Sequence, residues 1–232
     1  LFGPLTGLEV RSTRVDGAAL VVEVSLSINL ASLTIEQVIG KRKKMLLGLK
    51  YMQEVAGVCH RDVSLENFLV NEDGNGVKCI LIDLGMCLRS PHIQCADGVR
   101  RRLMMPPQGT CGKWFYMSPE VLRNDVPFDG FKCDMWALGI ILYMMLMGSN
   151  PFDAPRETDR YFQFITNGHL RRMFLNGGYN FSEEVMDFMQ RLLSRDIKAR
   201  LGLHHAIGHP WILMGADLPP PPPQDQQKPA WM

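Results

Sequence analysis

Two carboxylates and one amide, Asp62, Asp83 and Asn67, are the residues of this 232-residue chain best suited to chemistry. Two β-prone runs, 68–70 and 77–82, lie between Asn67 and Asp83 in the sequence. They flank an Asp-Gly and an Asn-Gly pair, and such pairs are the strongest short-range signal of a β-hairpin. Because a hairpin brings its two ends together, we expect Asp62 and Asn67 to lie near Asp83. Oxygen ligands of this kind suit magnesium, which usually shares them with a phosphate-bearing substrate.

The run from His60 to Asn67, HRDVSLEN, resembles the catalytic loop of eukaryotic protein kinases, H-R-D-x-x-x-x-N. Asp83-Leu84-Gly85 resembles their D-F-G motif, with Leu in place of Phe. Three later runs resemble further motifs of the family: SPE at 118–120, DMWALG at 134–139 and HPW at 209–211. The resemblance covers residues from about 34 to 213, and the run of motifs is most similar to Ser/Thr kinases of the calcium/calmodulin-kinase type.

The resemblance implies an ATP-dependent transfer of the γ-phosphate to protein hydroxyls, with ATP and Mg²⁺ as cofactors. Asp62 would orient the substrate hydroxyl and accept its proton, and His60 and Arg61 complete the catalytic motif. Asn67 and Asp83 would hold the magnesium ions that bridge the phosphates. The partner would be a protein substrate.

Two residues at the implied active site depart from the family's pattern. Ser64 occupies the position where Ser/Thr kinases carry a Lys that touches the γ-phosphate, and a hydroxyl cannot supply that charge. Lys113 stands where a Thr usually contacts the catalytic Asp, and it would compensate electrostatically for the missing Lys. Both are candidate catalytic residues, and they leave the choice between Ser/Thr and Tyr specificity open, although the other motifs favour Ser/Thr.

The first part of the chain predicts two strands, 8–15 and 18–26, around an Asp-Gly turn. In a kinase they would be the last strands of the small lobe, with Glu23 near the hinge that contacts adenine; an unrelated hairpin or leader is the alternative. No G-x-G-x-x-G loop and no V-A-I-K-like strand is present, so we expect a truncated or degenerate small lobe. The rival function is therefore a pseudokinase or kinase fragment that acts as a binding or scaffold module.

These patterns predict an α+β, protein-kinase-like fold with a mostly helical C-terminal lobe, a small β-hairpin at the active site and an incomplete N-terminal β lobe. We expect a small-lobe remnant or leader over 1–33, the large lobe over 34–213 and a proline-rich tail over 214–232. Apolar spacing predicts a helix over 34–57, capped by Thr34 and stopped by Gly57. The tail is either a linker or a ligand for a proline-recognising module.

The stretch 85–120, here called segment 85–120, loses periodicity and predicts a long flexible loop, which in the family is the activation segment. Ser90 and Thr110 are either phosphorylation sites that would pair with Arg61 or unmodified surface hydroxyls. The resemblance also implies that Glu120, at the end of the segment, forms a buried ion pair with Arg200.

Composition excludes several classes of protein. The chain is 46% hydrophobic and 21% charged with a net charge of +1, which argues against nucleic acid or an acidic membrane surface as the main partner. The basic run 41–44 is either a nucleic-acid or localisation patch or a solvated helix face, and the balanced charge favours the latter. The longest apolar stretch, 137–147, predicts a buried core helix rather than a membrane span. Six scattered cysteines fit reduced thiols in a cytoplasmic or nuclear protein.

Overall fold

A computed structural model describes residues 8–16, 19–26, 35–73 and 76–213. Within them the fold is α+β, and its strands pair into four antiparallel two-stranded sheets, β1-β2, β3-β6, β4-β5 and β7-β8. The strands are β1 (Leu8–Asp16), β2 (Ala19–Leu26), β3 (Val58–Cys59), β4 (Phe68–Asp73), β5 (Gly76–Leu81), β6 (Leu88–Arg89), β7 (His92–Gln94) and β8 (Arg100–Arg102). The longer helices are α1 (Ile35–Lys50), α3 (Gly130–Met147), α4 (Arg160–Thr166), α5 (Leu170–Asn176) and α6 (Glu183–Leu192). The shorter ones are α2 (Pro119–Arg123), α7 (Leu203–Ile207), α8 (Pro210–Leu213), the π-helix η2 (Tyr51–Ala56) and the 3₁₀ turns η3 (Leu65–Asn67), η4 (Leu84–Met86) and η5 (Trp114–Tyr116).

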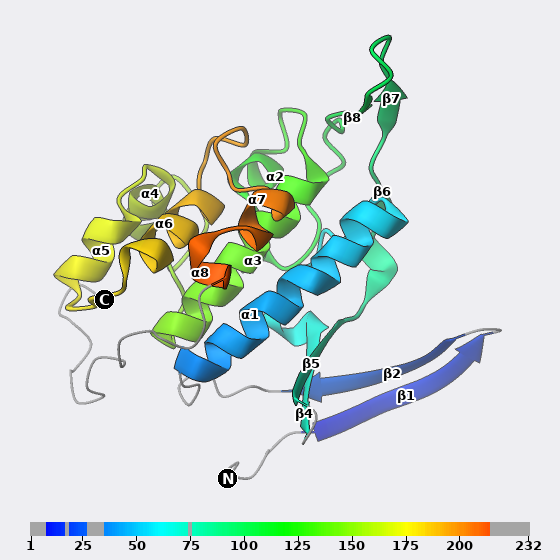
Figure 1. Ribbon diagram of the computed structural model, residues 1–232, viewed down its shortest axis with the longest axis horizontal. Helices are drawn as coiled ribbons and strands as arrows, with labels where there is room; N and C mark the ends of the chain where they lie inside the picture. Colours follow the sequence, from blue (N-terminus) through cyan, green and yellow to red (C-terminus); the bar gives the residue numbers. More distant parts are fainter. Residues whose placement is uncertain (1–7, 17–18, 27–34, 74–75, 214–232) are drawn as a thin grey trace.

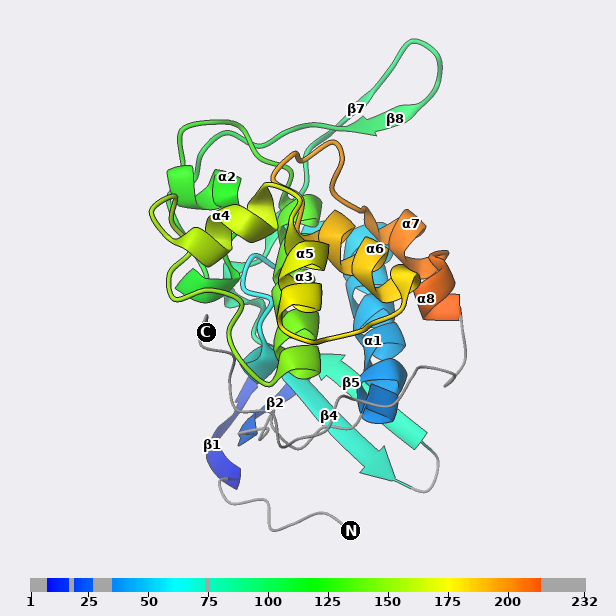
Figure 2. The ribbon, with the colours of Figure 1, turned by 90° about the vertical axis from the view of Figure 1, so that its left-hand side faces the viewer.

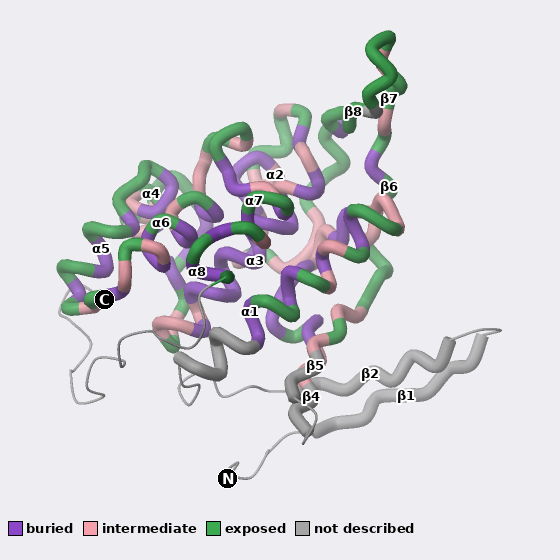
Figure 3. Tube along the Cα trace, viewed as in Figure 1, coloured by how far each residue is buried: buried purple, intermediate pink, exposed green. Residues whose placement is uncertain are grey.

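Helix α3 is the centre of the hydrophobic core, and Figures 1 and 2 show it surrounded by the other helices. It begins after Asp129, whose carboxylate accepts the Phe131 and Lys132 backbone N–H groups, and it ends at Gly148, where φ is +67°. Figure 3 shows that most of α3 is buried, as the apolar run predicted. It is also the one helix in the described part of the chain whose length and composition would suit a membrane span, and here it packs against α1, α6 and η5.

The helix predicted over 34–57 is α1 continued by η2, and it ends as predicted at Gly57, where φ is +68°. Thr34, the predicted cap, lies outside the described residues. Met45, Leu46 and Leu49 form its buried face against the core. The same helix lies against β5, so it supports the hairpin that leads to Asp83.

The prediction that residues 41–44 form a solvated helix face is wrong for half of the run. Lys43 and Lys44 are exposed, but Lys41 and Arg42 are buried, with 5% and 1% of their surface accessible. The guanidinium of Arg42 lies 4.4 Å from the ring centroid of Trp211 and donates a hydrogen bond to the Trp211 carbonyl. The reason is tertiary, because α1 packs against α7 and α8 from the far end of the chain.

The two predicted hairpins are both present. β4 pairs with β5 in a register that sets Phe68 opposite Leu81, so the chain before β4 meets the chain after β5. β1 pairs with β2, and Glu23 lies on β2 opposite Arg11; the side chain of Glu23 is outside what the structure describes, and so is the proline-rich tail. The interpretation of β1 and β2 as a small-lobe remnant stays a prediction.

Segment 85–120 is more ordered than its sequence indicates. Its first part pairs with β3 through β6, and β7 and β8 then form an arm that projects from the helical body (Figures 1 and 2). Thr110 is exposed, but Ser90 is 4% accessible and its backbone N–H donates to the Gly57 carbonyl. The expectation of a surface hydroxyl at Ser90 is therefore wrong, because the pairing of β6 with β3 carries that residue into the interior.

Candidate active site

The residues 60–67, here called loop 60–67, are fastened to the core by Asp134 of α3. One carboxylate oxygen of Asp134 accepts the backbone N–H of His60 at 2.8 Å, and the other accepts that of Arg61 at 2.9 Å. Burial raises the pKa of Asp134 to about 7, against the opposing effect of these two hydrogen bonds. Arg61 has a positive φ of +68°, which is uncommon outside glycine, and the double anchor holds it there.

His60 connects loop 60–67 to the end of the β4-β5 hairpin. Its ring is fully buried, and Nε2–H donates to the Ile82 carbonyl at 2.9 Å while Nδ1 accepts the Asp62 backbone N–H at 3.3 Å. Because burial disfavours the charged ring, the pKa of His60 is lowered, which agrees with a neutral ring that donates at one nitrogen and accepts at the other. The Ile82 N–H also donates to the Asn67 carbonyl at 2.9 Å. Asp83 therefore follows directly after a residue that is bonded to both ends of the loop.

The amide of Asn67 fixes the carboxylate of Asp62. Asn67 Nδ2 donates to the Asp62 carbonyl at 2.7 Å and to Asp62 Oδ2 at 3.0 Å, and Asn67 is buried. Asp83 is exposed, has a left-handed backbone with φ +63° and accepts the Gly85 N–H at Oδ1. As expected from the hairpin, the backbone that leads into Asp83 lies beside Asn67, which in turn holds Asp62. The oxygens of Asn67 and Asp83 are of the type that magnesium prefers.

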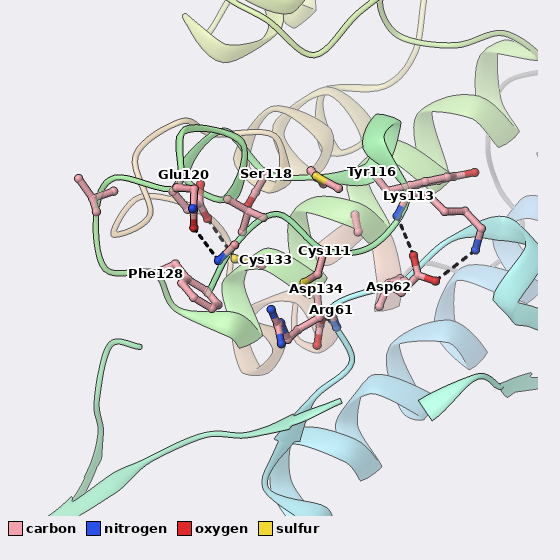
Figure 4. A pocket seen from close by; sticks show the side chains of 17 residues that line it. Arg61, Asp62, Cys111, Lys113, Tyr116, Ser118, Glu120, Phe128, Cys133 and Asp134 are labelled. Carbon is pink, nitrogen blue, oxygen red and sulfur yellow. Dashed lines mark hydrogen bonds and ion pairs between the residues drawn. The ribbon is translucent and has the colours of Figure 1, made fainter. Parts of the chain in front are cut away.

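Lys113, from segment 85–120, completes the cluster (Figure 4). Its backbone N–H donates to Asp62 Oδ1 at 2.8 Å. Its ammonium Nζ lies 3.3 Å from Asp62 Oδ2, 2.8 Å from Ser64 Oγ and 3.4 Å from Asn67 Oδ1. The two residues that depart from the family's pattern, Ser64 and Lys113, are therefore in direct contact.

A small cavity of about 30 Å³ lies between loop 60–67 and segment 85–120. Figure 4 shows Arg61, Asp62, Cys111 and Lys113 around one end of it. The pKa of the Cys111 thiol is raised, chiefly by burial, so this cysteine is a poor nucleophile at neutral pH. Asp62 is the carboxylate of this cavity that lies beside the Lys113 ammonium.

The far end of segment 85–120 is tied to the core by a buried ion pair. Arg200 Nη1 donates to Glu120 Oε1 at 2.6 Å and Arg200 Nη2 to Glu120 Oε2 at 2.8 Å, and both side chains are almost inaccessible. Burial by itself would raise the pKa of Glu120, but the hydrogen bonds and charge of Arg200 hold it below its ordinary value. The predicted buried pair is confirmed.

Sequence reasoning missed two residues that position this site. Asp134 is one of them, and an acidic residue directly before a long apolar run is itself a signal of a buried polar contact. Gly112 is the second; its φ is +85°, and a Cβ there would lie 2.4 Å from the Arg61 carbonyl oxygen. Of the candidate site residues, Glu23 alone has no described side chain and is not placed in the site.

Comparison with known proteins identifies the family of this chain. The family model of the protein kinase domain matches residues 22–212. Sperm motility kinase 2B of Mus musculus is 31% identical over 188 residues, which are 79% of this chain and 34% of that protein. Two human proteins, serine/threonine-protein kinase H1 and serine/threonine-protein kinase DCLK3, are 34% and 36% identical over 73% and 67% of this chain.

The chain spans only part of the curated relatives it matches, 37% of the length of human kinase H1 and 22% of DCLK3. The matched region nevertheless includes loop 60–67, the β4-β5 hairpin, segment 85–120 and every helix from α1 to α7. The chain therefore belongs to the eukaryotic protein kinase family.

Proposed function

We propose that this chain transfers the γ-phosphate of ATP to serine or threonine hydroxyls of a protein substrate. The observation that carries the proposal is the hydrogen-bond network by which the buried ring of His60 joins Asp62, Asn67 and Ile82, the residue directly before Asp83. The names of the curated relatives, which are serine/threonine-protein kinases, support the choice of acceptor.

Asp62 is the residue that would act on the acceptor hydroxyl. Its Oδ1 accepts the Lys113 backbone N–H and its Oδ2 accepts the Asn67 amide, so the carboxylate has a fixed orientation at the edge of the cavity. In the proposed reaction the hydroxyl oxygen forms a bond to the γ-phosphorus as the bond from that phosphorus to the bridging oxygen breaks. The hydroxyl proton passes to Asp62 and ADP leaves. The protein contributes positioning and charge, because phosphoryl transfer needs little covalent chemistry from it.

Asn67 and Asp83 would hold the magnesium ions. Both offer oxygen donors, they come from the two ends of one hairpin, and the exposed position of Asp83 makes its carboxylate accessible to a cation. When bound, the metal neutralises charge on the phosphates of ATP. The role of Glu23 near adenine rests on the resemblance of β2 to a small-lobe strand, and the match to the family model begins within β2.

The proposal is tested by Asp62→Asn with a peptide library of serine and threonine acceptors, at millimolar MgATP because the sequence lacks a glycine-rich loop. Phosphotransfer should fall on the order of 100- to 10,000-fold, the usual contribution of a positioned acid–base group, with MgATP affinity nearly unchanged. Asp125→Asn is the matched control, since Asp125 is exposed and, within the described part of the chain, its ion pair is with Arg123. Unchanged turnover in Asp62→Asn would reject the proposal, and a comparable loss of MgATP affinity would mean that Asp62 binds the metal instead.

The second candidate function is a pseudokinase that acts as a binding or scaffold module. The specific observations in its favour are the missing glycine-rich loop and lysine strand in this sequence. It predicts that no phosphotransfer above the level of Asp62→Asn is found at any MgATP concentration. Phosphotransfer that depends on Asp62 would exclude it.

A further inference from the structure

We propose that Lys113 supplies, from segment 85–120, the cation for the γ-phosphate that loop 60–67 does not carry. This inference rests on the proposed function and adds a residue to it. Ser64 offers only a hydroxyl, and the structure places the ammonium of Lys113 on that hydroxyl at 2.8 Å. The loop hydroxyl and the segment ammonium together form one polar pair across the site.

The Lys113 ammonium has three acceptors in the described structure, and two of these three contacts are long. An ammonium has three N–H donors, and a strong charge-assisted bond to a carboxylate measures about 2.7–2.9 Å. Only the contact with Ser64 has such a length, whereas those with Asp62 and Asn67 are 3.3 and 3.4 Å. The Lys113 side chain is 39% exposed but that of Asp62 only 10%, so the lysine is the more accessible of the two, and an incoming phosphate would replace the long contacts of its ammonium.

A cation at this position would add to the positive charge that the magnesium ions supply. Asp62 and Asp83 bring two carboxylates to the place where a triphosphate would bind, and like charges oppose its approach. Among the ion pairs of the described residues, Lys113 is the partner of Asp62. During transfer, negative charge shifts toward the leaving ADP and the phosphoryl oxygens. The Lys113 ammonium would stabilise that charge electrostatically, without gaining or losing a proton.

The position of Lys113 has a second consequence, because its backbone must dock before its side chain can act. The Lys113 N–H donates to Asp62 Oδ1 at 2.8 Å, and the preceding Gly112 approaches the Arg61 carbonyl so closely that a Cβ would lie 2.4 Å from it. A cation carried by loop 60–67 itself would be present in every conformation of segment 85–120. Here it arrives only with the docked segment.

The test compares the affinities of the chain for MgATP and MgADP by ligand-detected NMR, together with phosphotransfer, because only ATP carries the γ-phosphate. Lys113→Met should weaken MgATP about tenfold and leave MgADP unchanged, and should reduce turnover by a similar factor or more. The exchanged variant, Ser64→Lys with Lys113→Thr, should recover most of the MgATP affinity. Lys43→Met, which removes an exposed charge from α1, is the matched control and should change neither affinity.

Each other outcome has a distinct meaning. Equal ATP-to-ADP affinity ratios in the parent and in folded Lys113→Met would overturn the inference while leaving the proposed function intact. Turnover equal to or above that of the parent would also overturn it, because the ammonium would then only screen Asp62. If Lys113→Met does not fold, Lys113→Gln and the exchanged variant provide the same comparison. A parent that binds neither nucleotide and transfers no phosphate would reject the proposed function and this role with it.

Discussion

At the scale of single residues, the candidate site depends on buried polar groups that hold the reactive ones. The carboxylate of Asp62 is oriented by Asn67 and by the backbone of Lys113, and its own backbone N–H donates to His60. His60 in turn reaches the Ile82 carbonyl next to Asp83. Protonation of the buried His60 ring would break the hydrogen bond that Nδ1 accepts from the Asp62 backbone N–H, so folding should favour the neutral ring.

We expect the contribution of His60 to stability to be lost in acid. Its pKa in the folded protein lies below the ordinary value of 6.5, so between the two values the unfolded chain binds more protons than the folded one. The contribution is therefore complete above pH 6.5 and declines as the pH falls from 6.5 toward the folded pKa. Chemical denaturation of the parent and of His60→Gln from pH 8 to pH 5 measures the effect. The stability advantage of the parent should shrink over this range; a constant difference would contradict the neutral buried ring.

At the scale of elements, two of the contacts that attach segment 85–120 to the rest of the protein lie close to the candidate site or to the buried core. Gly112 packs against loop 60–67 and carries Lys113 into the site, and Glu120 at the start of α2 binds Arg200. Between β6 and Gly112 the arm formed by β7 and β8 projects outward (Figure 2). The docking of Gly112 is thus the element contact on which the position of Lys113 depends.

Gly112→Ala should reproduce the loss of ATP preference expected for Lys113→Met. The added Cβ would meet the Arg61 carbonyl oxygen at 2.4 Å and Asp62 Oδ1 at 3.1 Å, so the segment must move away from the loop. Gly109→Ala is a matched control, because Gly109 also has a positive φ, +83°, but its Cβ would meet nothing within 4 Å. The ratio of MgATP to MgADP affinity is the measurement. An equal effect of both substitutions would show that backbone strain, and not the contact with loop 60–67, is responsible.

At the scale of the whole molecule, the buried pair of Glu120 and Arg200 joins parts of the chain that are 80 residues apart. Arg200 also donates to the Lys132 carbonyl of α3, and its guanidinium lies 5.2 Å from the ring centroid of Trp136. One side chain therefore ties segment 85–120, the core helix α3 and the C-terminal helices into one body.

Arg200→Ala should lower the melting temperature by roughly 6–20 °C. The reason is that Glu120 would remain as an unpaired buried charge, which costs about 3–5 kcal/mol, and for a domain of this size each kcal/mol corresponds to about 2–4 °C. Arg101→Ala is the control, since Arg101 pairs with Asp97 on the exposed arm, where an ion pair contributes no more than about 1 kcal/mol. Differential scanning calorimetry of the two variants checks the expectation. Equal melting temperatures would show that the Glu120 carboxylate is hydrated or protonated when Arg200 is absent, so that no unpaired charge remains buried.

The sequence by itself determined the features that depend on neighbours in the chain. The Asp-Gly and Asn-Gly pairs predicted the β4-β5 hairpin, the hairpin predicted that Asp62 and Asn67 approach Asp83, and a single glycine predicted the end of the first helix. The apolar run predicted the buried helix α3, although not its start at Gly130. These inferences succeed because turn geometry, helix capping and apolar periodicity are local properties.

Only the tertiary structure decided the rest. It placed the ammonium of Lys113 on Ser64, which lies 49 residues earlier in the chain, and it buried Arg42 beneath Trp211, 169 residues away. It also turned the backbone of Arg61 into a left-handed conformation, which is stabilised by the hydrogen bond from the Arg61 N–H to the Asp134 carboxylate. The physical reason is that the free energy of each arrangement comes from contacts between segments distant in sequence. Such contacts have no period and no fixed spacing, so they become visible only when the chain is folded.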